Sequence, residues 1–402
     1  MESDTNRLAC QRPSSPGRTT ICFDFDTPID RSHTASLKWD KYRNRDIIPL
    51  WVADMDFRSP PQVIEALHRR VAHGIFGYTL PPAELTETVV AMLAATYGWR
   101  VEPEWLTWLP GLVTGLNVAC RAVGETGDAV LTTTPVYPPF LSAPGQSNRD
   151  LITVALAEKN NHWSLDLARL AAAITSRTRL LLLCNPHNPV GRVYDRQELV
   201  AIAALCQRHD LAICSDEIHN GLILDSGLEH TPVATLAPEI ESRTITLLAP
   251  SKTFNLPGLG CSLAVISDRG LRHRFRQAMA GIVPHVNTLG YTAALAAYRD
   301  GGPWHRALLD YLRGNCQLIV DAVATMPGIT MAPVEATYLA WLDCRATGLA
   351  DPATWFEAAG VGLSDGREFG APGFVRLNFG CPRATLELAL SRMTQALAAR
   401  NH

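Results

Sequence analysis

The chain has 402 residues, of which 47% are hydrophobic and 19% are charged, and its formal net charge is −3. This composition is typical of a globular protein with a sizeable core and allows one large or two medium domains. The charge gives no indication of nucleic-acid or anionic-membrane partners, and no apolar run approaches the roughly 20 residues of a membrane-spanning helix.

The ten cysteines contain no Cys-x-x-Cys pair. We therefore interpret them as reduced thiols of a cytoplasmic protein, and expect neither a disulfide framework nor a metal site. Residues 1–21 are rich in Ser, Thr, Arg and Pro and lack the apolar stretch of a signal peptide, so we expect a loose N-terminal extension.

The N-terminal part of the chain is irregular before it becomes helical. Residues 22–58 are rich in aromatic side chains and are expected to pack across a larger body. Within them, residues 48–57 favour a strand and a turn, although their two acids leave a role in a site equally open. Residues 59–70 predict a helix with Ser59 as its N-cap, and residues 83–97 predict a second helix.

Short apolar runs alternate with helical patterns between about residues 105 and 265. The runs that we interpret as strands span residues 129–132, 180–184, 212–215, 244–248 and 263–266, and the clearest helices span residues 112–123 and 196–209. This alternation predicts an α/β fold with a mainly parallel sheet covered by helices on both faces. Ligands of such sheets bind at the carboxyl ends of the strands, where three polar motifs lie.

The C-terminal part predicts a different arrangement. Residues 268–326 are rich in Ala and Leu and are expected to be helical, with a break at residues 301–303. Residues 338–342 and 374–379 have the pattern of strands, and residues 384–399 that of a closing helix. We therefore predict a large domain over residues 59–300 and a smaller α+β domain over residues 301–402, with which residues 22–58 pack.

Lys252 follows the apolar run 244–248 and lies between small residues. A lysine at the end of a buried strand can be desolvated, lose its proton and form a Schiff base with a carbonyl group. Most lysines in such places are simply exposed, so the other motifs must decide between these interpretations.

Two further motifs follow predicted strands. The loop 185–191 has two Asn-Pro steps, which favour a rigid extended turn that would hold the amide of Asn188 at a fixed point. The motif 215–219 includes Asp216 and His219, an acid that could pair with a ring cation and a histidine that could donate to an oxygen. An ordinary turn and a helix cap, respectively, are the alternatives.

Two motifs could bind anions. Pro110-Gly111-Leu112-Val113-Thr114-Gly115 lies at a predicted helix start, where free N–H groups favour a phosphate, although a plain turn has the same pattern. Arg376 lies in an apolar strand and could bind a carboxylate, although an ion pair is the commoner role. Together with the lysine, the acid and the polar loop, these groups match the needs of pyridoxal 5′-phosphate.

With these motifs the sequence resembles the fold-type I pyridoxal-phosphate enzymes of the class I/II aminotransferase superfamily, and more narrowly the MalY/PatB-like cystathionine β-lyases (C–S lyases). The resemblance extends from about Phe23 to the C-terminus and implies a mainly parallel seven-stranded sheet in the large domain. The narrower motifs are Lys38-Trp39-Asp40-Lys41-Tyr42, Trp51-Val52-Ala53-Asp54-Met55-Asp56-Phe57, Gly74-Ile75-Phe76-Gly77-Tyr78, Ser215-Asp216-Glu217-Ile218-His219, Ser251-Lys252-Thr253-Phe254-Asn255 and Glu335-Ala336-Thr337-Tyr338-Leu339-Ala340-Trp341.

The resemblance also implies roles for individual residues, with Lys252, Asp216 and Tyr137 as the catalytic set. Lys252 would hold the cofactor and take a proton, and Asp216 would pair with the pyridine nitrogen. The residues implied around the ring are Asn188 and His219 near its oxygen, Ile218 beneath it and Tyr137 above it. The residues implied at the phosphate are Leu112, Val113, Ser251 and, from the neighbouring subunit of a homodimer, Tyr78. Arg376, with backbone at Ala53 and with Tyr78, would bind the substrate.

Three positions depart from the patterns of these relatives. Gly260 stands where many superfamily members have an arginine, and Ala249 stands where they have a serine. The phosphate is therefore expected to have fewer side-chain partners. In lyases of this branch the second residue after the histidine is often an acid, whereas here His219 is followed by Asn220 and Gly221. We therefore expect an altered substrate pocket.

The leading function implied by the resemblance is cleavage of cystathionine or another S-substituted L-cysteine to a thiol, pyruvate and ammonia. An aminotransferase is the alternative, as is a relative in specialised metabolism that decarboxylates or oxidatively deaminates a cysteine S-conjugate at Cα. A regulatory, protein-binding role is a further class, but no basic DNA-binding helix supports it.

Overall fold

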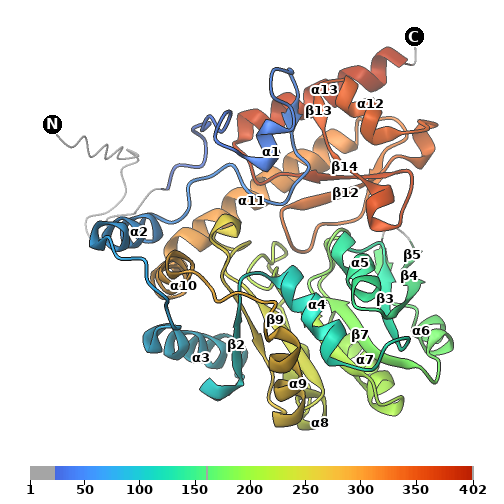
Figure 1. Ribbon diagram of the computed structural model, residues 1–402. Helices are drawn as coiled ribbons and strands as arrows, with labels where there is room; N and C mark the ends of the chain where they lie inside the picture. Colours follow the sequence, from blue (N-terminus) through green and yellow to red (C-terminus); the bar gives the residue numbers. More distant parts are fainter. Residues whose placement is uncertain (1–22, 160–161, 401–402) are drawn as a thin grey trace.

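A seven-stranded sheet forms the centre of the computed structural model, which describes residues 23–159 and 162–400 (Figure 1). Its strands, in the order β2-β10-β9-β8-β7-β3-β4, are β2 (Leu106–Leu109), β10 (Ser262–Val265), β9 (Thr244–Leu248), β8 (Ala212–Asp216), β7 (Thr178–Cys184), β3 (Ala129–Thr134) and β4 (Asp150–Ala155). Strand β10 is antiparallel to both of its neighbours, and the other adjacent pairs are parallel. This arrangement confirms the predicted α/β fold.

Helices cover both faces of this sheet because successive side chains of a strand point to opposite faces. Leu180 and Leu182 of β7 pack with α4 (Leu112–Ala122), α5 (Pro138–Gln146) and α9 (Arg269–Met279), whereas Leu181 and Leu183 pack with α6 (Leu167–Ala173) and α7 (Arg196–Arg208). Each such buried leucine contributes roughly 1.5–3 kcal/mol of hydrophobic stabilisation. The other helices of this part are α3 (Ala83–Tyr97), α8 (Pro238–Glu241) and α10 (Thr288–Asp300).

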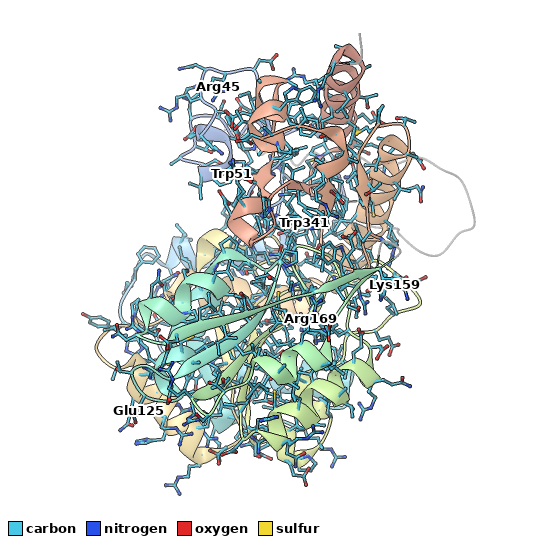
Figure 2. All side chains as sticks on the ribbon, turned by 90° about the vertical axis from the view of Figure 1, so that its right-hand side faces the viewer. Arg45, Trp51, Glu125, Lys159, Arg169 and Trp341 are labelled. Carbon is cyan, nitrogen blue, oxygen red and sulfur yellow. The ribbon has the colours of Figure 1, made fainter. Side chains whose placement is uncertain are left out.

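A second sheet of four antiparallel strands lies in the C-terminal part, in the order β11-β12-β15-β14. Its elements are β11 (Thr330–Met331), β12 (Leu339–Asp343), β14 (Ser364–Asp365) and β15 (Phe374–Asn378), accompanied by α11 (Gly302–Val323), α12 (Pro352–Ala358) and α13 (Arg383–Arg400). Figure 2 shows Trp51 and Trp341 near the level where this part meets the part built on the large sheet. The predicted domain boundaries remain a prediction.

The N-terminal segment packs against this second part of the molecule. Its short elements are α1 (Leu37–Asp40) and β1 (Ile48–Pro49), followed by α2 (Pro61–His73), and β1 pairs in parallel with β13 (Val361–Gly362). Strands β5 (Ala157–Lys159) and β6 (His162–Ser164) form a separate two-stranded pair. Short 3₁₀ helices span Pro103–Trp105, Val233–Thr235, Pro257–Leu259, Arg345–Thr347 and Gly366–Phe369.

Two local predictions need correction. Ser59 is not the N-cap of α2: Pro60 occupies that position, and the Ser59 hydroxyl donates to the Asn255 carbonyl at 2.9 Å. Of residues 48–57, only Ile48–Pro49 form a strand (β1), and the rest is irregular because the carbonyls of residues 51–55 accept from side chains and not from a neighbouring strand. The expected loose extension falls outside the described residues. Within the part of the chain that the structure describes, no helix is long and apolar enough to cross a membrane.

Candidate active site

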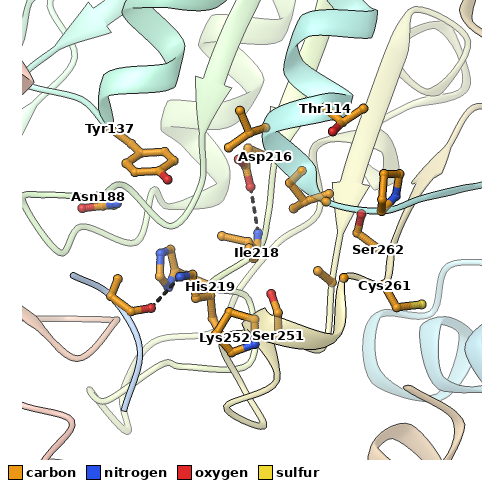
Figure 3. A pocket seen from close by; sticks show the side chains of 18 of the residues that line it. Thr114, Tyr137, Asn188, Asp216, Ile218, His219, Ser251, Lys252, Cys261 and Ser262 are labelled. Atoms are coloured by element: carbon orange, nitrogen blue, oxygen red, sulfur yellow. Dashed lines mark hydrogen bonds between the residues drawn. The ribbon is translucent and has the colours of Figure 1, made fainter. Parts of the chain in front are cut away.

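A cavity lies at the carboxyl ends of β7, β8 and β9 (Figure 3). Asp216, the last residue of β8, and two residues that follow β7 and β9, Asn188 and Lys252, line it together with the start of α4. This is where a parallel sheet is expected to bind its ligand. The structure brings ten of the twelve predicted site residues to this cavity, namely Ala53, Leu112, Val113, Tyr137, Asn188, Asp216, Ile218, His219, Ser251 and Lys252.

Lys252 lies in a tight turn after β9. The N–H groups of Phe254 and Leu256 donate to the carbonyls of Pro250 and Ser251, both at 2.9 Å, and fix this turn. The lysine Nζ donates to the carbonyl of Ala53 at 2.5 Å. Loss of hydration, assisted by the charge of Arg376, lowers the pKa of Lys252 to about 8. A substantial fraction of this amine is therefore neutral near physiological pH, as a base requires.

Asp216 is the last residue of β8, and its carboxylate is buried. The N–H of Ile218 donates to Oδ1 at 3.1 Å. Burial raises the pKa of the Asp216 carboxyl to about 7, although the Ile218 hydrogen bond opposes this shift. A cation placed against this carboxylate would lower its pKa again, because an opposite charge favours the ionised form. The position is therefore suited to a protonated ring nitrogen.

His219 is buried, and its Nδ1 has no hydrogen-bond partner among the residues that the structure describes. Burial, together with the charges of Lys252 and Arg376, lowers the pKa of His219 to about 3, so its imidazole is neutral. Buried polar atoms nearly always have partners. A polar ligand in the cavity would satisfy this requirement.

Tyr137 and Asn188 link two loops at one side of the cavity. The N–H of Tyr137, the residue before α5, donates to the Asn188 carbonyl at 3.2 Å. Figure 3 shows the Tyr137 ring and the Asn188 amide at the same side of the cavity. Burial raises the pKa of the Tyr137 phenol, against the opposing charge of Arg376. The ring therefore stays neutral and can stack on a planar ligand.

The other end of the cavity is suited to a phosphate. Helix α4 begins at Leu112 after Gly111, which provides no side-chain cap, so the N–H groups of its first turn are available. Gly260 has a φ of +56°, and a Cβ there would lie 3.0 Å from the Pro110 carbonyl oxygen. Position 260 therefore cannot carry an arginine without strain. Among the described residues that line the cavity, Lys252 is the only lysine or arginine.

Arg376 lies on β15, beside the cavity, and is buried. Its Nη1 donates to Asn188 Oδ1 at 3.0 Å, and its Nη2 donates to the carbonyl of Trp51 at 2.9 Å and to Ser364 Oγ at 3.3 Å. Its Nε has no hydrogen-bond partner among the residues that the structure describes. Burial lowers the pKa of Arg376 to about 10, so it remains a cation that can bind a carboxylate.

Tyr78 does not line the cavity of its own chain, and its side chain is fully exposed. Conversely, two residues that we did not single out support the site. The hydroxyl of Tyr338, buried before β12, donates to the Ala53 carbonyl at 2.9 Å. Ser364 Oγ donates to the Trp51 carbonyl at 2.8 Å. Tyr338 belongs to a motif of the resemblance, whereas no local pattern distinguishes Ser364.

These features fit pyridoxal 5′-phosphate. The available N–H groups of α4 match a phosphate, the unpartnered His219 matches a polar ring substituent, and Asp216 matches a ring cation. The aminotransferase class I and II family model matches residues 45–393. The chain belongs to the class I and II aminotransferase family. This confirms the predicted family.

Curated relatives within the aminotransferase family cover almost the whole chain. Cystathionine beta-lyase PatB of Bacillus subtilis is 39% identical over 392 residues, which cover 94% of this chain and 100% of that protein. Protein MalY of Escherichia coli is 32% identical over 391 residues, with 94% and 99% coverage. The resemblance to the MalY/PatB branch is confirmed.

Solved structures of this fold match equally well. The crystal structure of OvoB has a TM-score of 0.92 and 49% identity, and covers 94% of this chain and 100% of that chain. The structure of cystalysin from Treponema denticola, described as containing a pyridoxal 5′-phosphate cofactor, has a TM-score of 0.91 and 34% identity with the same coverage. These matches confirm the fold-type I architecture.

Proposed function

We propose that this chain is a pyridoxal-phosphate-dependent C–S β-lyase that cleaves cystathionine or another S-substituted L-cysteine to a thiol, pyruvate and ammonia. The observation that carries the proposal is the amine of Lys252 in a cavity that also holds the buried carboxylate of Asp216. Full-length similarity to proteins named cystathionine beta-lyase supports this reaction over the other chemistry of the family.

Each group of the cavity has a place in holding the cofactor. Lys252 would hold it through Nζ, and Asp216 would face its ring nitrogen. His219 and Asn188 would face its ring oxygen, Tyr137 and Ile218 its two faces, and the backbone of Leu112 and Val113 with Ser251 its phosphate. When bound, pyridoxal 5′-phosphate supplies an electron sink for the pair left at Cα of an amino acid.

The residues of the chain then perform the proton and binding steps. Arg376 binds the α-carboxylate, which replaces the Asn188 oxygen or the Trp51 carbonyl as its acceptor. Lys252 removes the Cα proton, and its lowered pKa makes this possible near neutral pH. Breaking the Cα–H bond is followed by breaking the Cβ–S bond, and the sulfur leaves as a thiolate that takes up a proton. Water converts the released enamine to pyruvate and ammonia.

A substrate panel tests the reaction. We expect thiol and pyruvate in equal amounts from cystathionine or from at least one S-alkyl cysteine, measured with a thiol reagent and lactate dehydrogenase. Absence of both products from every member would contradict the proposal. Transfer of the amino group to an added keto acid without thiol release would show the aminotransferase alternative instead. Release of carbon dioxide, or oxidative deamination with formation of peroxide, from a substrate whose C–S bond stays intact would show chemistry confined to Cα.

Arg376→Lys is expected to lower kcat/KM about 30- to 1000-fold, because a lysine cannot form the bidentate hydrogen bond to the substrate carboxylate in a buried site. The loss should appear mainly in KM, since the carboxylate is bound in both the ground and the transition state. Steady-state kinetics measure this effect. Arg367→Lys is the control, since Arg367 is exposed and pairs with Asp365 and Asp351. Equal kinetics for the two variants would contradict the assigned role.

The homodimer with shared sites is part of the same proposal. The irregular stretch after α2 exposes four large apolar side chains, those of Ile75, Phe76, Tyr78 and Leu80. Adjacent exposed apolar side chains are typical of an interface. We place Tyr78 at the phosphate of the neighbouring subunit, which would also assist substrate binding.

Mixing two inactive variants tests this sharing. In a mixed dimer, one site combines Lys252→Ala of one chain with Tyr78→Ala of the other chain. The second site then has both residues intact, so each mixed dimer keeps one intact site. After subunit exchange at equal amounts, we expect about a quarter of wild-type activity, because half of the dimers are mixed. No recovery despite proven exchange would show that each chain completes its own site.

We also propose a cytoplasmic location. The described residues contain eight cysteines, all free and most of them buried. This use of cysteine suits a reducing compartment.

A further inference from the structure

Side chains make most of the hydrogen bonds to the backbone of residues 51–56, and within the described chain only the N–H groups of Asp54 and Asp56 donate to backbone carbonyls. Residues 51–56 form no regular secondary structure and contribute Ala53 to the cavity. Each carbonyl from Trp51 to Met55 accepts a hydrogen bond from a side chain. The donors are Ser364 and Arg376 to Trp51, Asn378 to Val52, Lys252 and Tyr338 to Ala53, Lys38 and Asn378 to Asp54, and Arg31 and Asn255 to Met55.

A charged cluster with a buried Lys38–Asp56 pair anchors one end of this segment. Asp56 accepts from Lys38 Nζ at 2.7 Å, from Arg31 Nη1 at 2.6 Å and from Trp39 Nε1 at 2.9 Å. Arg31 Nη2 also donates to Asp54 Oδ2 at 2.6 Å. Lys38 is fully buried and Asp56 is 4% exposed. We call Arg31, Lys38, Trp39 and Asp56 the anchoring cluster.

The cluster is not explained by charge stabilisation alone. A buried ion pair is often no more stabilising than apolar side chains of similar size, but it fixes the direction of the groups that it joins. Here Lys38 Nζ also donates to the Asp54 carbonyl at 3.2 Å, one peptide after the carbonyl that accepts from Lys252. The cluster thus fixes the backbone next to the acceptor of the lysine amine.

We propose that the anchoring cluster positions the amine of Lys252 through the carbonyl of Ala53. Its members are positioning residues, because none of them lines the cavity. The inference rests on the proposed function, in which Nζ of Lys252 both holds the cofactor and removes the Cα proton. A carbonyl displaced by about 1 Å would misplace this amine, and such errors cost up to about 100-fold in rate.

The Lys38→Met/Asp56→Asn double variant tests the proposal, since it removes the pair without leaving one buried charge alone. Arg45→Met/Glu357→Gln is the control: it breaks an ion pair, at 3.0 Å, between the same N-terminal segment and α12 that does not touch residues 51–56. Three quantities are measured: the rate at which cofactor-free protein captures pyridoxal 5′-phosphate, followed by visible absorbance; kcat and KM; and the melting temperature.

We expect the double variant to slow capture and to lower kcat by about 10- to 100-fold, with KM changed less than about threefold, because Ser364 still holds the Trp51 carbonyl beside Arg376. The control should change neither. Unchanged capture and kcat, or equal losses in the control, would overturn the proposal. If the double variant does not fold, Trp39→Phe decides: capture slowed at least about threefold supports positioning, and unchanged capture overturns it.

The capture measurement separates the two hypotheses. It requires no substrate, so it tests the positioning of Lys252 even if wild-type protein cleaves no C–S bond. Failure of every substrate with normal capture would count against the lyase alone. If the double variant captures the cofactor at the normal rate and the wild-type protein cleaves a C–S bond, only the proposal for the anchoring cluster is contradicted.

Discussion

Lys252→Ala is expected to abolish covalent attachment of the cofactor and to lower turnover at least about 10³-fold, within the range that a positioned base contributes. The loss has two causes, because the amine would both hold the cofactor and remove the Cα proton. Attachment is measured by reducing the imine with borohydride before denaturation and gel filtration and recording the pyridoxyl absorbance that stays with the protein, and pyruvate release measures turnover. The melting temperature should show that the variant is folded.

Two controls make the Lys252 result specific. Lys159→Ala removes an exposed lysine of β5 and should leave both measurements unchanged. A small primary amine added to Lys252→Ala should restore part of the turnover, since it can supply the missing base in the space that the side chain leaves. Cofactor retained covalently in Lys252→Ala would refute the assignment.

Asp216→Asn is expected to lower kcat by about 10²- to 10⁴-fold, because the ring nitrogen would lose the charge that keeps it protonated. It should also remove a pH dependence of cofactor binding. The pKa of Asp216 is raised to about 7 without a cation, so wild-type affinity should fall as the pH decreases below about 7 and the carboxyl becomes protonated. Titration of cofactor-free protein at pH 6 and pH 8 measures this difference.

Asp216→Asn is expected to lower kcat but to raise the thermal stability of the cofactor-free protein. Because folding raises the pKa of the carboxyl, the cofactor-free fold loses stability as the pH rises from the ordinary value of 3.8 to about 7. At pH 8 the cofactor-free Asp216→Asn variant should therefore melt at a higher temperature than wild type. Asp210→Asn, at the exposed amino end of β8, is the control. An unchanged kcat in Asp216→Asn would contradict the role of the carboxylate.

Local sequence patterns predicted five of the seven strands of the large sheet and the groups at the ends of three of them, whereas the strands β2 and β4 were not predicted. The run 244–248 matches β9, because a short continuous apolar run is typical of a strand buried on both faces, and residues 83–97 match α3, which ends at Gly98. The loops after β7, β8 and β9 then share one edge of the sheet by topology alone. This is why Asn188, Asp216 and Lys252 could be expected close together.

The remaining features depend on contacts between distant parts of the chain. Lys252 and the Ala53 carbonyl are separated by 199 residues, and Tyr338 reaches the same carbonyl across 285 residues. No periodicity predicts such a meeting. Ser59 illustrates the same limit. Its local pattern predicts a helix cap, but its hydroxyl donates a hydrogen bond to the distant carbonyl of Asn255.

The geometry at Gly260 has a consequence for how long the protein keeps its cofactor. With the left-handed backbone and the close Pro110 carbonyl, the groups that this chain would offer to the phosphate are neutral backbone and hydroxyl groups. Retention of the cofactor would then depend strongly on the proposed covalent bond to Lys252, which each turnover would open. Residence time of the cofactor should therefore be shorter in protein that is turning over substrate than in protein at rest, so that catalysis itself limits the working life of each molecule.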